Sequence, residues 1–100
     1  ARGIVGEAAM KIRVLMVDDE LEFIETLAER LESRGLAVAT AGSGDEAIEK
    51  VAREDYDVVV LDILMPVKDG VATLKEIKQI RPLIEVIMLS GNATVESAVD

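Results

Sequence analysis

The sequence predicts an α/β fold in which a doubly wound parallel sheet carries helices on both faces. Short apolar runs alternate along the chain with amphipathic segments of helical length. The runs are continuous rather than alternating in polarity, as in strands that are buried on both faces. Half of the 100 residues are apolar and only two are aromatic, so the core of this single domain is expected to be aliphatic.

Four strands are predicted, over residues 12–17, 36–40, 57–62 and 84–89. The third contains Val58, Val59, Val60 and Leu61, which makes it the strongest buried strand in the chain. Right-handed crossovers join such strands, and ligands in sheets of this kind lie beyond the C-terminal strand ends. Functional side chains are therefore expected where each strand ends.

Three helices are predicted from apolar residues at helical spacing, and a fourth is expected to start at Thr94. Gly35 stands where a helix C-terminal glycine is expected, the turn at residues 42–45 can cap the second helix, and Pro82 ends the third. The expected apolar faces are Leu21, Ile24, Ala28 and Leu31 in the first helix, Ala47, Ile48, Val51 and Ala52 in the second, and Val71, Leu74 and Ile77 in the third.

Composition excludes several classes of function. With 20 acidic and 11 basic residues the net charge is −9, which argues against direct nucleic-acid or membrane binding and suits a protein that binds cations. The absence of Cys and His excludes disulfides, thiol catalysis, imidazole chemistry and zinc sites of the usual kind. No secretion signal or membrane span is evident, so a cytoplasmic location is expected. Residues 1–9 are interpreted as a leader or an expression remnant, and residues 10–100 as the domain.

Acidic side chains follow two of the predicted strands. Asp18 and Asp19 come after the first strand, Asp62 closes the third, and Ser90 follows the fourth. Each has an ordinary structural explanation, either as a turn residue or as an acid at a helix N-terminus. Together, three carboxylates at one sheet edge repel each other unless a cation lies between them. Oxygen ligands without His or Cys point to Mg²⁺.

The same residues carry a family resemblance. Asp18-Asp19, the D-x-x-M-P-x-x-D-G run at residues 62–70, and Ser90 resemble the receiver domain of bacterial two-component response regulators. The resemblance covers residues 11–100. It implies a flavodoxin-like (CheY-like) doubly wound parallel sheet with strand order 2-1-3-4, in a receiver domain truncated at the C-terminus, so that the fifth strand and fifth helix are missing.

The resemblance also implies a chemistry. Asp62 is then the phosphoacceptor, which takes a phosphoryl group from a sensor histidine kinase in a Mg²⁺-dependent reaction. The metal ligands that it implies are Asp18, Asp19, Asp62 and the backbone carbonyl of Leu64. A domain of this kind is not an enzyme toward other substrates, because it catalyses only its own phosphorylation and dephosphorylation.

Other parts of the family pattern concern the switch and the output. Ser90 is implied to bind the phosphoryl group and draw its loop inward, while Pro66 and Gly70 shape the loop after Asp62. The catalytic lysine that the family carries at the end of the fifth strand is not present in these 100 residues. The downstream output domain is likewise expected to lie outside this chain.

Three alternatives accompany this interpretation. In the first, the chain is a receiver-like fragment that folds and self-associates but is not competent for phosphorylation, with a homo-oligomer formed through the exposed edge of the fourth strand. An aspartyl-nucleophile phosphatase of the haloacid dehalogenase kind is disfavoured, because Leu64 stands where that class needs a second acid. A flavin carrier is disfavoured, because Asp18, Asp19 and Glu20 would repel a phosphate.

Overall fold

Helices and strands alternate along the chain in the computed structural model, which describes residues 11–62, 70–89 and 95–97. The predicted order of elements is confirmed up to the fourth strand. In chain order the elements are β1 (Arg13–Val17), α1 (Leu21–Ser33), β2 (Ala37–Ala41), α2 (Gly44–Arg53), β3 (Val58–Asp62), α3 (Gly70–Ile80), β4 (Glu85–Leu89) and β5 (Val95–Ser97). Of the described helices, none is long and apolar enough to cross a membrane.

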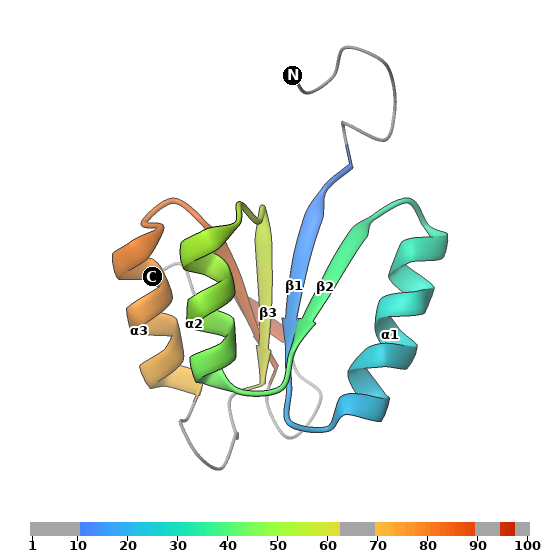
Figure 1. Cartoon of the computed structure of the whole chain (residues 1–100), viewed down its shortest axis with the longest axis horizontal. Helices are drawn as coiled ribbons and strands as arrows, with labels where there is room; N and C mark the ends of the chain where they lie inside the picture. The colour runs from blue at the N-terminus through green and yellow to red at the C-terminus, as the bar shows by residue number, and fades with distance from the viewer. Residues whose placement is uncertain (1–10, 63–69, 90–94, 98–100) are drawn as a thin grey trace.

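The sheet has the strand order β2-β1-β3-β4-β5, and its first four strands are parallel (Figure 1). This confirms the predicted order 2-1-3-4. The strand β1 pairs with β2 on one side and with β3 on the other, so the order in which strands are added to the sheet reverses at β1. Val17 lies opposite both Ala41 and Leu61, so the C-terminal ends of these three strands are level with each other.

The strand β5 departs from the sequence prediction. A helix was expected from Thr94 onward, but residues 95–97 form a short strand that runs antiparallel to β4. The prediction was wrong because the outer edge of β4 offers unpaired backbone groups, and hydrogen bonds to that edge outweigh the weak tendency of a short segment to become helical. The edge of β4, which was expected to be exposed along its length, is therefore paired over Ile87–Leu89.

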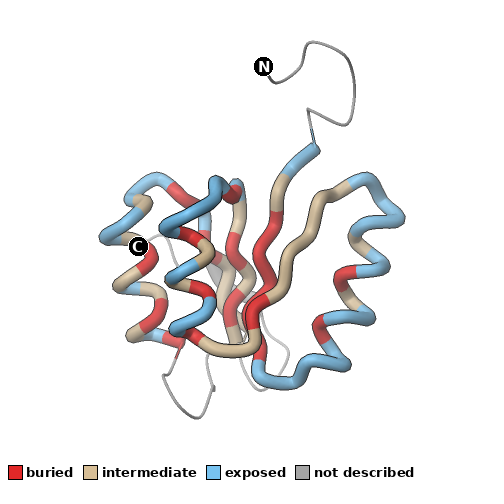
Figure 2. Tube along the Cα trace, in the orientation of Figure 1, coloured by how far each residue is buried: buried red, intermediate tan, exposed pale blue. Residues whose placement is uncertain are grey.

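Two apolar cores lie on opposite faces of the sheet, with α2 and α3 covering one face and α1 the other (Figures 1 and 2). Alternate residues of β1 point to opposite faces, so Leu15 and Val17 enter the larger core while Val14 and Met16 enter the smaller one. The larger core consists of Leu15, Val17, Ala41, Ala47, Val51, Tyr56, Val59, Leu61, Ile77, Ile84 and Val86, and the smaller of Val14, Met16 and Ile24 with partly buried neighbours.

The ends of α1 and α2 follow from local sequence. Gly35 has a φ of 93°, as predicted for a helix C-terminal glycine, and the amide of Leu36 donates to the carbonyl of Leu31 across the turn. At the start of α2 the Ser43 hydroxyl accepts from the Glu46 amide, and a Glu46 carboxylate oxygen accepts from the Gly42 amide. This reciprocal pair fixes the loop between β2 and α2, which lies at the same sheet edge as the acidic residues.

Three residues assigned to the buried helix faces are exposed. Leu21, the first residue of α1, and Val71, the second residue of α3, are about half exposed, at 52% and 44%. Ala52 is exposed near the end of α2. Thr73, in contrast, is fully buried in α3 although it is polar.

Candidate metal centre

Three acidic side chains meet at the C-terminal edge of the sheet. Asp18 directly follows β1 and Asp62 is the last residue of β3, and these strands are neighbours with Val17 opposite Leu61. Asp19 follows at the start of the connection to α1. One carboxylate oxygen from each of the three lies within 4.8 Å of the other two. The convergence that was predicted from the sequence is therefore present in the fold.

Asp18 is held in place by backbone contacts on both sides. Its amide donates to the carbonyl of Ala41 at 3.1 Å, which extends the pairing of β1 with β2 by one residue. Its carboxylate oxygen Oδ1 accepts from the amide of Glu20 at 2.9 Å. This side-chain contact forms a tight turn that directs the chain into α1. The Asp18 side chain therefore has a fixed orientation before any ligand binds.

The three carboxylates have unequal surroundings. Asp18 is only 5% exposed, Asp62 is half-buried and Asp19 is exposed. Burial raises the pKa of Asp18 from 3.8 to about 6; the hydrogen bond from Glu20 opposes this effect, and the charges of Asp62 and Asp19 add to it. At neutral pH the buried Asp18 carboxylate is therefore ionised, and this buried charge lowers the stability of the folded state.

A divalent cation suits this arrangement. Its donors are all carboxylate oxygens, the type preferred by Mg²⁺ and Ca²⁺. Two ligands of one Mg²⁺ lie at most about 4.2 Å apart, twice the metal–oxygen distance of about 2.1 Å. The observed upper limit of 4.8 Å is somewhat larger than that value. The donor type and the approximate spacing of the three carboxylates therefore suit a hard divalent ion.

Other predicted site residues divide into two groups. Leu64, Pro66 and Ser90 lie outside the described residues. Gly70, which was expected in the loop, is the buried first residue of α3. The role of the Glu20 amide in orienting Asp18 was not predicted, although a D-D-E sequence directly before a helix is compatible with such a turn.

The comparisons with known proteins agree with this geometry. A family model described as the response regulator receiver domain matches residues 14–100. The chain belongs to this family. Among curated proteins, the receiver domain is 40% identical over 89 residues to the transcriptional regulatory protein ZraR of Escherichia coli K12. That match covers 89% of this chain but 20% of ZraR, so the receiver domain spans about one fifth of that relative.

Two solved structures show the same fold in ligand-bound or modified states. A response regulator from Burkholderia pseudomallei with a phosphorylated aspartic acid, calcium and citrate has a TM-score of 0.76 and 28% identity, covering 81% of this chain and 48% of that one. The regulator TrrA from Thermotoga maritima, in complex with Mg²⁺ and BeF, has a TM-score of 0.74 and 38% identity, covering 79% and 69%.

These findings identify a receiver domain of the response regulators of two-component systems. They do not favour the alternative of a receiver-like fragment that only folds and self-associates.

Proposed function

We propose that this receiver domain accepts a phosphoryl group on Asp62 from a phosphohistidine of a sensor histidine kinase. The observation that carries the proposal is the position of Asp62 at the end of β3, with its carboxylate beside those of Asp18 and Asp19. Asp62 is half-buried, so part of its side chain remains accessible to a donor.

The transfer consists of one displacement at phosphorus. A carboxylate oxygen of Asp62 forms a bond to phosphorus while the phosphorus–nitrogen bond of the phosphohistidine breaks. The electron pair of that bond returns to the imidazole nitrogen, and no oxidant or reductant is needed. The product is an acyl phosphate on Asp62. Its hydrolysis by water returns the carboxylate and releases inorganic phosphate, so the domain is expected to catalyse only its own phosphorylation and dephosphorylation.

We propose Mg²⁺ as the bound ion, held by Asp18, Asp19 and Asp62 together with the backbone carbonyl of Leu64. When bound, the ion would supply positive charge that offsets the repulsion between the attacking carboxylate and the phosphoryl oxygens. Asp18 contributes a fixed ligand because the Glu20 amide and the β2 strand hold it, whereas Asp19 contributes an adjustable one because it is exposed.

The remaining residues of the family pattern complete the proposal. We expect Ser90 to hydrogen-bond the phosphoryl group, and Pro66 and Gly70 to shape the path of the chain after Asp62. Gly70 does this from the first turn of α3. A downstream output domain would read the phosphorylated state, since the matched relatives are several times longer than this chain.

The first experiment is phosphorylation by a small donor. The chain is incubated with Mg²⁺ and acetyl phosphate, and intact masses are recorded for the parent, Asp62→Asn and Asp57→Asn. We expect one added phosphoryl group on the parent and none on Asp62→Asn. Asp57→Asn is the matched control, because Asp57 lies just before the same strand at the opposite edge of the sheet. It should be labelled like the parent.

Three results would contradict the proposal. Label that persists on Asp62→Asn would move the phosphoacceptor to another residue. A parent that binds Mg²⁺ by calorimetry but takes no label from acetyl phosphate would show that the metal centre does not suffice for transfer in this chain. A parent that neither binds Mg²⁺ nor takes label would refute the metal assignment as well.

A further inference from the structure

Exposed apolar side chains gather at the edge of the sheet opposite the metal centre. Six large apolar residues in the described part of the chain are exposed. Three of them, Ile12, Ile80 and Leu83, lie at the N-terminal edge of the strands, before β1, at the end of α3 and before β4. Leu83 is the extreme case, because its exposed fraction is 97%. A leucine so fully exposed contributes nothing to the stability of an isolated domain.

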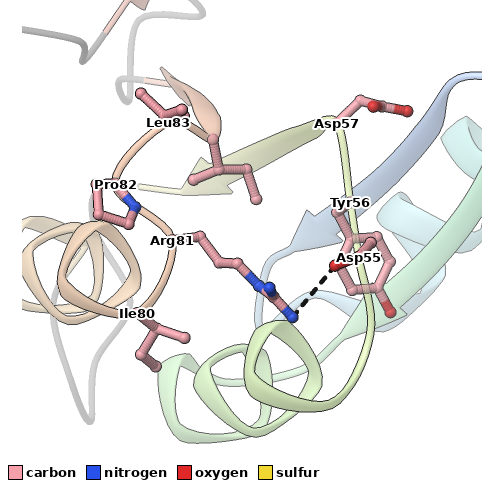
Figure 3. Close-up of a pocket in the computed structure, with 8 residues that line it drawn as sticks. Asp55, Tyr56, Asp57, Ile80, Arg81, Pro82 and Leu83 are labelled. Carbon is pink, nitrogen blue, oxygen red and sulfur yellow. Dashed lines mark ion pairs between the residues drawn. The ribbon is translucent and has the colours of Figure 1, made fainter.

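A hollow of about 440 Å³ adjoins Leu83 (Figure 3). Its lining includes Tyr56 and Ile84, which are buried at 8% and 6% exposure, while Ile80, Pro82 and Leu83 form its exposed apolar part. The hollow thus has an apolar lining whose inner residues belong to the larger core.

The polar part of the hollow is fixed by contacts between segments. The Arg81 guanidinium donates from Nε to the carbonyl of Val51 at 3.1 Å and lies 3.2 Å from a carboxylate oxygen of Asp55. These contacts join the α3–β4 connection to α2 and to the segment before β3, and Figure 3 shows Arg81 directed toward Asp55. The α3–β4 connection, which carries the exposed apolar residues, is therefore held in place by the contacts of Arg81 with Val51 and Asp55.

The charges around the hollow are nearly balanced. Arg13 and Arg81 face Glu54, Asp55 and Asp57, which sums to −1, whereas the whole chain carries −9. A second copy of this acidic chain is repelled least at such a surface. Because both signs of charge lie beside the hollow, two copies related by a two-fold axis can set Arg81 of each against carboxylates of the other.

We propose that this surface, made of Ile80, Pro82 and Leu83 with the hollow beside them, is a homodimer interface. It contains both a projecting side chain and the concavity that such a side chain fills. A two-fold axis through the surface places Leu83 of each copy in the hollow of its partner, so one patch serves both sides. The partner is a second copy of this chain, because the projecting Leu83 side chain, the hollow and the nearly balanced charges all belong to the same surface.

The interface lies at the opposite end of the strands from Asp18, Asp19 and Asp62. Dimerisation there leaves the metal centre of each copy open to a phosphodonor. It also differs from pairing through the edge of β4, which is already occupied by β5 over Ile87–Leu89.

The test is sedimentation equilibrium of the full chain from about 1 μM to about 1 mM, a range that covers weak to moderate dimers. We expect the average mass of the parent to rise from 10.8 kDa toward twice that value. Leu83→Glu should weaken dimerisation about tenfold or more, because it places a charge where an apolar anchor is buried. Phe23→Glu is the matched control, since Phe23 is 49% exposed but lies on α1.

Each outcome decides the proposal. A parent that stays at 10.8 kDa throughout the range overturns it. A dimer that Leu83→Glu and Phe23→Glu weaken equally, or that neither weakens, also overturns it, because the interface then lies elsewhere. Loss of the dimer in Leu83→Glu alone supports it, provided that the thermal melting curve of this variant matches that of the parent. An unchanged curve is expected for so exposed a residue.

Discussion

Burial gives three aspartates of one cluster different properties. Asp18, Asp19 and Asp62 carry the same functional group, yet Asp18 is the one among them that is buried, and burial raises its pKa to about 6. A carboxylate with a raised pKa favours the protonated form in the folded state. Its contribution to folding stability is therefore fully present below about pH 4 and is lost as the pH rises through about 6.

This leads to a prediction for the Asp18→Asn variant. Asparagine keeps an Oδ1 acceptor for the Glu20 amide but cannot ionise. In metal-free buffer at about pH 7.5, Asp18→Asn should therefore melt at a higher temperature than the parent. The difference should shrink at about pH 5, where the parent is largely protonated at Asp18. Differential scanning calorimetry at the two pH values measures both quantities.

Added Mg²⁺ supplies the control for this variant. Saturating Mg²⁺ should stabilise the parent more than Asp18→Asn, because the variant has lost a charged ligand. A variant that melts below the parent at about pH 7.5 without metal would show that the Asp18 carboxylate stabilises the fold, contrary to the crowded-carboxylate explanation.

At the scale of elements, the loop between β2 and α2 depends on a reciprocal cap. Ser43 and Glu46 each satisfy a backbone amide that would otherwise lack a partner at the start of α2. This loop follows Ala41, whose carbonyl accepts from the Asp18 amide, so the cap supports the strand end that positions the metal centre.

We predict that Ser43→Ala lowers the free energy of unfolding by about 1 kcal/mol, as for other helix N-caps. Ser33→Ala is the matched control, because the Ser33 hydroxyl donates to the carbonyl of Arg30 at the C-terminal end of α1 and caps no free amide. Urea denaturation of the parent and both variants gives the comparison. Equal losses in the two variants would argue against a special role for the Ser43 cap.

The boundaries of the helices and strands show which parts of the fold can be predicted from the sequence. Gly35 and the turn at residues 42–45 mark helix ends by local chemistry, and both predictions are confirmed, with Ser43 as the capping residue of that turn. The prediction from Thr94 onward failed, because residues 95–97 take their structure from the free edge of β4 and not from their own spacing. Pairing with a strand elsewhere in the chain cannot be predicted from the spacing of a few neighbouring residues.

At the scale of the molecule, the interior strand β1 contributes side chains to both cores. Leu15 is fully buried in the larger core, between β2 and β3. We predict that Leu15→Ala lowers the free energy of unfolding by about 2–5 kcal/mol, through lost apolar burial and the cavity that remains. Leu83→Ala, at 97% exposure, should change it by less than about 0.5 kcal/mol when measured at low concentration. Chemical denaturation measures both, and similar losses would contradict the assignment of the core.

The candidate metal centre could be predicted more fully than the opposite edge. Asp18, Asp19 and Asp62 all follow strands of strong apolar character, and parallel topology alone brings such residues together. The hollow beside Leu83 arises from the approach of the α3–β4 connection to residues 55–57, which lie far away in sequence. Neither the burial of Tyr56 nor the exposure of Leu83 follows from the local pattern.

The single tyrosine gives this chain a built-in optical label. Tyr56 is the only Tyr and there is no Trp, so near-ultraviolet emission arises from one site. Its ring lies 5.2 Å from the Arg13 guanidinium, and its hydroxyl donates to Glu54 at 2.7 Å. Burial and the Glu54 carboxylate raise the pKa of Tyr56 to about 12. A change in this emission when Asp62 is phosphorylated would therefore report a signal that has crossed the full length of the sheet.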